Sequence, residues 1–281
     1  MIDETVAEIR EMRSHSSSAV AVKAATALRE LLTREYVSAE AFDRDLEHNA
    51  GALRRANPSH ASLHNAMRSI TEETLGEGET PEAAKQLLEN AITETVDRIE
   101  SGKRRAAAHA ADLLDDGETF LTHDYSSTVL EAVETACADG KLLEAYVTEA
   151  RPRYLGRKTA RTLAGIDRVE PHLIVDSAGG HFLPECDRVL IGMDCIVEET
   201  LYNRIGTYPL VATAAREGVP VTVVGSSTKV IDDFRFENEF RPDSEVMREP
   251  VEGIEIENPA YDATPVELVD TLVTDEGVQD P

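Results

Sequence analysis

Several residues that could carry chemistry follow short apolar runs in the second half of the chain. Asp194 ends the run RVLIGMD. A carboxylate at the carboxyl end of a strand is well placed to act as a base or to bind sugar hydroxyls. A helix cap or a turn residue would give the same pattern. His123 and Asp124 end another run, FLTHD, where a histidine is more often structural than catalytic.

A candidate anion site lies in the segment 203–207. Asn203 and Arg204 are followed by Gly206 and Thr207, and a helix is predicted to begin near Tyr208. Free backbone donors at a helix N-terminus, together with a glycine and an arginine, can hold a phosphate. The alternative is an ordinary capped helix with a surface arginine, and the spacing alone favours neither.

Positively charged side chains follow two further runs. Arg151 and Arg157 come after EAYVTE, and arginine binds phosphate through paired hydrogen bonds. Lys229 follows GSST and could place a point charge near a phosphate. The alternatives are a solvated loop, ion pairs across an oligomer interface and an exposed lysine.

The elements that must position these residues alternate between strands and helices from residue 116 onward. Such alternation predicts an α/β fold with a parallel sheet covered on both faces, and ligands bind such sheets at the carboxyl ends of the strands. Residues 1–115 show helical periodicity, with a helix stop at Asn57-Pro58 and a helix start at Thr80-Pro81. We therefore expect a helical N-terminal domain at 1–115 and a Rossmann-like domain at 116–281.

The composition narrows the class of protein. The 281 residues carry a net charge of -26, and only six of the 28 basic residues are lysine. Acidic residues are spread through periodic segments, which indicates a folded surface adapted to concentrated salt and hence a halophilic source. An ordinary acidic bacterial protein is the alternative. Without a basic stripe, we expect no direct contact with nucleic acid.

The sequence also lacks the features of several other classes of protein and site. The three cysteines have no metal-type spacing, so no disulfide framework or metal site is expected. We find no nucleotide-binding glycine motif and predict no cofactor. The acidic N-terminus is unlike a signal peptide, and no apolar stretch is long enough to span a membrane. A cytoplasmic location follows.

Taken in order, several stretches resemble one superfamily. It comprises the alpha, beta and delta regulatory subunits of translation initiation factor 2B, ribose-1,5-bisphosphate isomerase and methylthioribose-1-phosphate isomerase. The resemblance covers at least residues 118–275, with a weaker similarity in MRSHSSSAVAVKAATAL and ANPSHASLHNAM. It is carried by the stretches FLTHDYSSTVLEAVETA, YVTEARPRYLGRKTA, IVDSAGG, VLIGMDCIVEETLYNRIGTYPLVATAAREGVPVTVV and NPAYDATPVELVDTLVTDEGV.

The resemblance implies roles for some of these residues. In the isomerases a cysteine and an aspartate transfer the protons, and the aspartate of the family's Gly-Ala-Asp motif corresponds to Asp194. The family's Asn-Lys-Ile-Gly-Thr matches Asn203 to Thr207, with Arg204 in place of lysine.

The chain departs from the isomerase pattern at three places. The cysteine follows a Thr-His pair, and Asp124 occupies that position here. The segments 15–18 and 57–59 replace an Arg-Gly-Ala-Gly turn and an Arg-Pro-Thr segment. The sequence THDYSSTVL is closer to the regulatory subunits, which also lack the cysteine.

Two hypotheses follow. The first is a non-enzymatic initiation factor 2B-like protein that binds a nucleotide or sugar phosphate and acts through protein contacts, including a possible translation factor. The second is an aldose-ketose isomerase of a phosphorylated ribose, with Asp194 as acid/base and Asp124 in an altered role. The missing cysteine favours the first. The resemblance also implies a homodimer or a hexamer.

Overall fold

The computed structural model describes residues 1–11, 17–231, 234–249 and 251–280. The chain forms two compact units, Met1–Ser101 and Gly102–Pro281. The helix α5 (Pro81–Leu113) contains the division, and the domain boundary expected at residue 115 lies just after this helix ends. The two units are described separately below.

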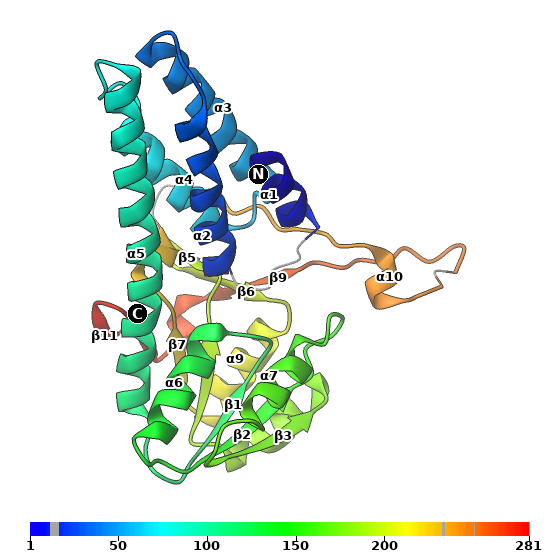
Figure 1. The fold of residues 1–281 in the computed structure, drawn as a ribbon. Helices are drawn as coiled ribbons and strands as arrows, with labels where there is room; N and C mark the ends of the chain where they lie inside the picture. Colours follow the sequence, from blue (N-terminus) through cyan, green and yellow to red (C-terminus); the bar gives the residue numbers. More distant parts are fainter. Residues whose placement is uncertain (12–16, 232–233, 250, 281) are drawn as a thin grey trace. The chain divides into compact units, whose positions relative to one another are not determined.

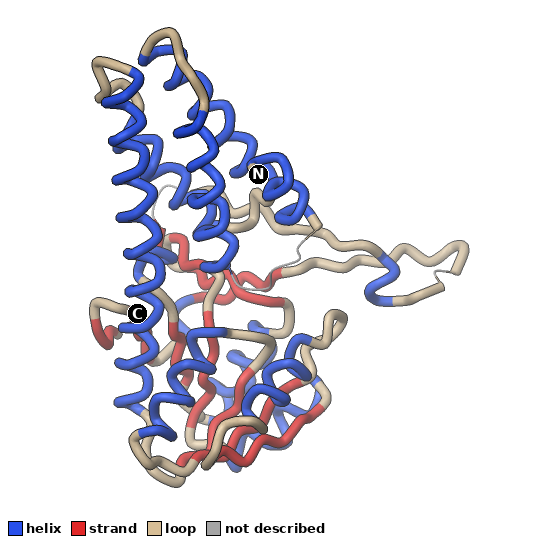
Figure 2. Tube along the Cα trace, in the orientation of Figure 1, coloured by secondary structure: helices blue, strands red, loops and turns tan. Residues whose placement is uncertain are grey.

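The first unit is helical, as predicted (Figures 1 and 2). In α3 the Ser38 hydroxyl caps the first turn by accepting from the Ala41 N–H at 3.3 Å, and the helix stops before Asn57-Pro58. Thr80 caps α5 in the same way, at 3.2 Å from the Ala83 N–H. The elements before α5 are α1 (Ile2–Arg10), α2 (Ser17–Ala27), the 3-10 helix η1 (Leu28–Thr33), α3 (Ala39–Ala56) and α4 (Ala61–Thr74).

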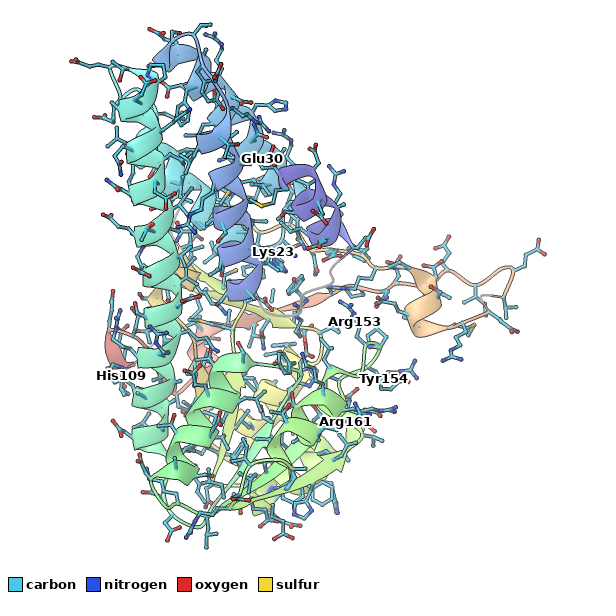
Figure 3. All side chains as sticks on the ribbon, viewed as in Figure 1. Lys23, Glu30, His109, Arg153, Tyr154 and Arg161 are labelled. Atoms are coloured by element: carbon cyan, nitrogen blue, oxygen red, sulfur yellow. The ribbon has the colours of Figure 1, made fainter. Side chains whose placement is uncertain are left out.

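An ionic network ties the start of α1 to η1. Glu30 is labelled in Figure 3. Its carboxylate accepts a hydrogen bond from the Ile2 N–H at 2.9 Å and pairs with Arg34. The Ile2 N–H and the Arg34 guanidinium favour the ionised carboxylate, so they lower the pKa of Glu30 to about 2. Apolar side chains such as Phe42, Leu63 and Leu88 form the core of this unit.

The second unit is built on a seven-stranded sheet with the order β11-β10-β7-β4-β1-β2-β3. Neighbouring strands are parallel, except that β11 runs antiparallel to β10. This mostly parallel sheet confirms the predicted α/β class. The strands are β1 (Glu118–Thr122), β2 (Leu143–Thr148), β3 (Val169–Ile174), β4 (Arg188–Gly192), β7 (Val221–Val224), β10 (Thr271–Thr274) and β11 (Gly277–Gln279).

The central strands β1, β4 and β7 are buried on both faces of the sheet, since successive residues of a strand point to opposite sides and nearly all of them are buried. Phe120 and Leu190 pack in one core with α6 (Ser127–Ala138) and the last turns of α5. Their neighbours Leu121 and Ile191 pack in the other core with α9 (Thr207–Glu217). The helix α7 (Leu155–Leu163) contributes Leu163 to the core that contains Phe120 and Leu190.

A smaller sheet with the order β8-β5-β6-β9 follows the carboxyl end of β4. The sequence analysis did not predict this sheet. They are β5 (Cys195–Val197), β6 (Thr200–Arg204), β8 (Val230–Ile231) and β9 (Tyr261–Pro265). The remaining short elements are η2 (Asp176–Ala178), α8 (Gly179–Phe182), η3 (Leu183–Glu185), η4 (Ser227–Lys229), α10 (Asp243–Val246) and η5 (Val266–Leu268).

The strand order creates a switch point between β1 and β4. The chain proceeds from β1 to β2 and β3 on one side, and from β4 to β7 and β10 on the other. Loops diverge at such a point and leave a crevice at the carboxyl ends of the strands. Within the described ranges, no helix combines the length and the apolar character needed to cross a bilayer.

Candidate functional site

Two aspartates leave the sheet at its switch point. Asp124 follows β1 and Asp194 follows β4, which are neighbouring parallel strands. The turn after β1 is packed closely on β4, because a Cβ atom at Gly192 would lie 2.4 Å from the Ser126 hydroxyl. Asp124 has a left-handed backbone, with φ at 61°, which is uncommon for a residue other than glycine. The fold thus holds both carboxylates at the same edge of the sheet.

Arg204 brings these carboxylates into one ion-pair network. It ends β6, and its Nε atom lies 3.4 Å from Asp194 Oδ2 and 3.6 Å from Asp124 Oδ2. Its guanidinium also lies over the ring of Tyr261, 4.7 Å from the centroid. Only 12% of the Arg204 side chain is exposed, so the pairs are poorly screened by solvent.

Burial changes the pKa values of Asp124 and Arg204 in this network. It raises the pKa of the Asp124 carboxyl above its ordinary value, and the nearby Arg204 charge offsets this only in part. Oδ1 of Asp124 has no hydrogen-bond partner among the described residues. Burial alone would lower the pKa of Arg204, but the charges of Asp194 and Asp124 hold it above its ordinary value. Asp124 can therefore hold a proton beside a cation that stays charged.

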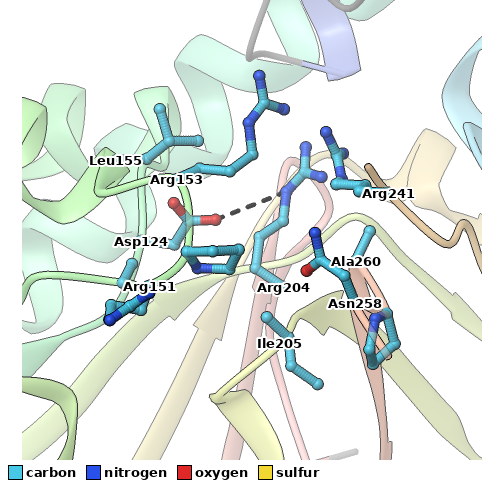
Figure 4. Close-up of a pocket in the computed structure, with 12 residues that line it drawn as sticks. Asp124, Arg151, Arg153, Leu155, Arg204, Ile205, Arg241, Asn258 and Ala260 are labelled. Atoms are coloured by element: carbon cyan, nitrogen blue, oxygen red, sulfur yellow. Dashed lines mark ion pairs between the residues drawn. The ribbon is translucent and has the colours of Figure 1, made fainter. Parts of the chain in front are cut away.

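A pocket opens beside this network (Figure 4). Figure 4 shows the guanidinium groups of Arg153, Arg204 and Arg241 reaching toward the same space, with Asp124 alongside. Burial and the charges of Arg241 and Arg204 lower the pKa of Arg153. Asn258 adds an amide to the wall. Such a cluster of positive charge in a strongly acidic chain suits an anionic ligand.

Acidic partners moderate this positive charge. Arg153 lies 3.6 Å from Glu245 in α10, and Arg241 lies 3.4 Å from Glu239. Arg241 donates a long hydrogen bond to Glu239, whereas the pair of Arg153 and Glu245 is an ion pair only, and both carboxylates belong to the segment that carries Arg241. A bound phosphate would therefore compete with Glu239 and Glu245 for the two guanidinium groups.

The predicted arginines of the β2–α7 loop differ in position. Arg151 lines the pocket, and its guanidinium donates to the Val246 carbonyl at 3.0 Å. Arg157 does not line it: its guanidinium pairs with Glu149 at 2.6 Å and lies over the ring of Tyr154, 3.9 Å from the centroid. The structure thus brings Arg151, but not Arg157, to the pocket.

The segment 203–207 is bonded largely within the protein. The Asn203 amide donates to the Thr207 hydroxyl at 3.1 Å, and that hydroxyl donates to the Arg204 carbonyl at 2.6 Å. The backbone N–H groups of Gly206 and Tyr208 both donate to one carboxylate oxygen of Asp262, at 2.8 and 2.9 Å. The N-terminus of α9 therefore already holds an anion of the protein itself.

Lys229 and His123 also make internal contacts. Lys229 is buried, and its ammonium donates to the Met193 carbonyl at 2.7 Å, next to Asp194. Burial lowers the pKa of Lys229, while the charge of Asp194 opposes this shift. His123 bonds the Thr148 hydroxyl at 2.6 Å and the Ile205 carbonyl at 2.8 Å, which gives it a structural role.

The three cysteines offer no reactive thiolate at this site. Cys137, Cys186 and Cys195 are buried and unpaired by disulfides, and none of them lines the pocket. Burial raises the pKa of Cys186 to about 12 and raises that of Cys195 as well. Within the described part of the chain, no group of three or more His, Cys, Asp or Glu side chains could hold a metal ion.

Sequence reasoning missed Arg241, Asn258 and Tyr261. They lie between β7 and β10, where neither strand nor helix periodicity is present. The only signal was the stretch NPAYDATP, which carries part of the resemblance but gave no hint of a site.

Comparisons with known proteins agree with this architecture. Residues 13–281 match the model of the Initiation factor 2 subunit family. A ribose 1,5-bisphosphate isomerase of Haloferax volcanii is 32% identical over 98% of this chain and 88% of its own length. A putative translation initiation factor eIF-2B subunit 2-like protein of Pyrococcus horikoshii is 30% identical, over 100% of this chain and 98% of its own. The crystal structure of the Pyrococcus horikoshii initiation factor eIF-2B superposes with a TM-score of 0.85 at 27% identity, covering 100% of this chain and 97% of that one.

Proposed function

Because this chain belongs to the Initiation factor 2 subunit family, we propose that it is a sugar-phosphate isomerase that converts a phosphorylated aldopentose of the ribose 1,5-bisphosphate type into its ketose. The observation that supports this proposal best is the pair of carboxylates, Asp124 and Asp194, that lie around Arg204. Asp124 and Arg204 line an arginine-rich pocket, and Asp194 pairs with this pocket-lining arginine. The similarity over nearly the whole chain to a protein named ribose 1,5-bisphosphate isomerase supports this choice.

The reaction requires an acid and a base. Opening a cyclic aldose 1-phosphate to a ketose breaks the bond between C1 and the ring oxygen and moves the C2 hydrogen to C1. The proton of the C2 hydroxyl is lost and the ring oxygen gains one. Two titratable groups with different proton affinities can divide this work.

Asp124 is suited to the acid role. Burial favours its protonated form, and its Oδ1 atom has no partner within the described residues. A protonated carboxyl beside the pocket can give its proton to the ring oxygen as the ring opens. Arg204 then stabilises the carboxylate that remains, at 3.6 Å.

Asp194 is suited to the base role. It lies 3.4 Å from Arg204, and its charge interacts with that of the buried Lys229. This carboxylate can accept the proton from the sugar. Arg151, Arg153 and Arg241 line the pocket and would hold the phosphate groups.

The experiment is an isomerase assay on the purified protein with ribose 1,5-bisphosphate, in dilute buffer and in concentrated KCl, with ketose formation followed by NMR. We expect turnover by the wild type and a loss of about 10²–10⁴-fold in Asp194→Asn. Asp139→Asn, at an exposed aspartate after α6, is the matched control and should keep full activity. A wild type that binds the sugar phosphate without turnover would contradict the proposal.

That last outcome would support a second candidate, the non-enzymatic phosphate-binding protein. It is favoured by one observation: an aspartate stands where the resembling isomerases have a cysteine, and no reactive thiol replaces it. The relatives favour the isomerase over this function. Calorimetry with AMP, GDP and ribose phosphates would identify the ligand, and a homodimer or hexamer remains the expected assembly.

A further inference from the structure

Glu245 connects the short helix α10 to the pocket. Its carboxylate lies 3.6 Å from the Arg153 guanidinium and accepts a hydrogen bond from the Asn258 amide at 3.4 Å. Arg153 and Asn258 both line the pocket. Among residues 242–249, all of which the structure describes, Glu245 is half-buried and every other residue is exposed. The helix α10 therefore directs this one carboxylate toward the pocket wall.

Two backbone carbonyls complete the attachment of α10. The Val246 carbonyl accepts a hydrogen bond from the pocket-lining Arg151 at 3.0 Å, and the Pro242 carbonyl accepts one from the Asn258 amide at 3.2 Å. Within the described residues, every hydrogen bond or ion pair that joins residues 242–247 to another segment ends on a side chain that lines the pocket. No residue of α10 is buried, so hydrophobic packing adds little to this attachment. Figure 1 shows α10 away from both sheets of the second unit.

The contacts of α10 can be displaced by a ligand. The side chains of Arg153 and Glu245 are 23% and 27% exposed, and an ion pair of this length that is open to solvent contributes little to stability. A phosphate group offers several oxygens to a guanidinium and forms shorter, stronger hydrogen bonds with it. A phosphate bound to Arg151 and Arg153 would therefore remove two of the contacts that hold α10 in place.

We propose that α10 is an autoinhibitory element: in the free protein Glu245 occupies Arg153 in place of a phosphate, and phosphate binding releases α10 from the pocket wall. The inference rests on the proposed function, because it requires that a phosphorylated ligand enters this pocket. The measured affinity is then the intrinsic affinity of the pocket, reduced by the fraction of molecules in which α10 is detached.

The first measurement is the affinity for ribose 5-phosphate in dilute buffer, by isothermal titration calorimetry. Glu245→Gln keeps the size of the side chain and removes the charge that pairs with Arg153, so we expect the affinity to rise about fivefold. Asp243→Asn is the matched control. It removes the same charge from the same helix, at an exposed side chain that makes no hydrogen bond or ion pair with a pocket residue of the described chain, and it should bind like the wild type.

The second measurement is the hydrogen exchange of α10. The Met247 N–H donates to the Asp243 carbonyl at 2.9 Å, so its exchange reports whether this turn is formed. A helix of four residues is not stable without its contacts. We therefore expect ribose 5-phosphate to accelerate exchange at Met247 in the wild type, although ligands usually slow exchange near their site.

The outcomes separate the inference from the proposed function. An affinity that is unchanged or lower in Glu245→Gln, or an equal rise in Asp243→Asn, would overturn the inference and leave the proposed function intact. Slower exchange at Met247 with ligand would also overturn it, because α10 would then close on the ligand. If neither the wild type nor Glu245→Gln bound ribose 5-phosphate, the proposed function would fail together with the inference.

Discussion

The Nε atom of Arg204 lies 3.6 Å from a carboxylate oxygen of Asp124, and both side chains are almost completely buried. Asp194 approaches the same nitrogen to 3.4 Å. One cation therefore serves two carboxylates at the switch point of the sheet. The stability of this network should therefore depend strongly on Arg204.

Replacing Arg204 tests how much its ion pairs with Asp124 and Asp194 contribute to the stability of the fold. Arg204→Gln leaves two buried carboxylates without their main counter-ion, so we expect a loss of about 3–5 kcal/mol in the free energy of unfolding. Urea denaturation measures it. The double variant Asp194→Asn/Arg204→Gln should recover part of the loss because the carboxylate that lies closest to Arg204 is neutralised. Arg216→Gln, at an exposed arginine of α9, is the control and should change stability little. A stable Arg204→Gln would contradict the network.

The arginines should differ in their effect on ligand affinity. Arg241→Gln removes a guanidinium from the pocket wall, and we expect the affinity for ribose 5-phosphate to fall by about 1.5–3 kcal/mol, as for hydrogen bonds to charged groups. Arg157→Gln alters an arginine that pairs with Glu149 outside the pocket, so its affinity should match the wild type. Isothermal titration calorimetry measures both. Equal effects in the two variants would mean that the pocket is not the ligand site.

Activity should depend on pH through Asp124. Burial raises the pKa of this carboxyl, so its protonated form persists to higher pH than for an exposed aspartate. As the acid, Asp124 must be protonated, and kcat/KM should therefore fall as pH rises through its pKa. The pH profile of the wild type measures this. An activity that increased with pH through the same range would assign Asp124 to the base role instead.

The first unit offers a separate test of stability. The pKa of Glu30 is about 2, below its ordinary value of 4.5, so its contribution to stability is present above pH 4.5 and is lost as pH falls toward 2. Since the side chain is partly exposed, we expect Glu30→Gln to cost about 1–2 kcal/mol at neutral pH. The difference from wild type should shrink in acid. Chemical denaturation at several pH values measures this, with the exposed Glu35→Gln as control. A difference independent of pH would contradict the assignment.

Local sequence signals were sufficient for β1, β2, β3, β4 and β7 of the main sheet, but not for β10 and β11. The strands that end at Thr122 and Gly192 are short apolar runs, and helices with clear periodicity separate most of the parallel strands. Asp124 and Asp194 were identified because each directly follows such a strand. Caps at Ser38 and Thr80 fixed helix starts for the same local reason.

Local sequence patterns could not predict the contacts between residues that are distant in the sequence. The N-terminus of α9 was a candidate site for a ligand anion, with an ordinary capped helix as the alternative, and Asp262, distant in the sequence, bonds the N–H groups of Gly206 and Tyr208. Lys229 was expected to face a phosphate, but its ammonium bonds the Met193 carbonyl. Arg241 reaches the pocket from a segment without periodicity. Such contacts depend on how distant segments pack together, which local patterns do not specify.

The most direct measurement is the rate at which Asp124→Asn converts ribose 1,5-bisphosphate, compared with wild type under the same conditions. Asparagine keeps the size of the side chain and removes the transferable proton. The proposed acid role predicts a fall of about 10²–10⁴-fold in kcat, with affinity for ribose 5-phosphate near that of the wild type. A variant that isomerised the sugar at the wild-type rate would contradict the claim that this carboxyl takes part in proton transfer.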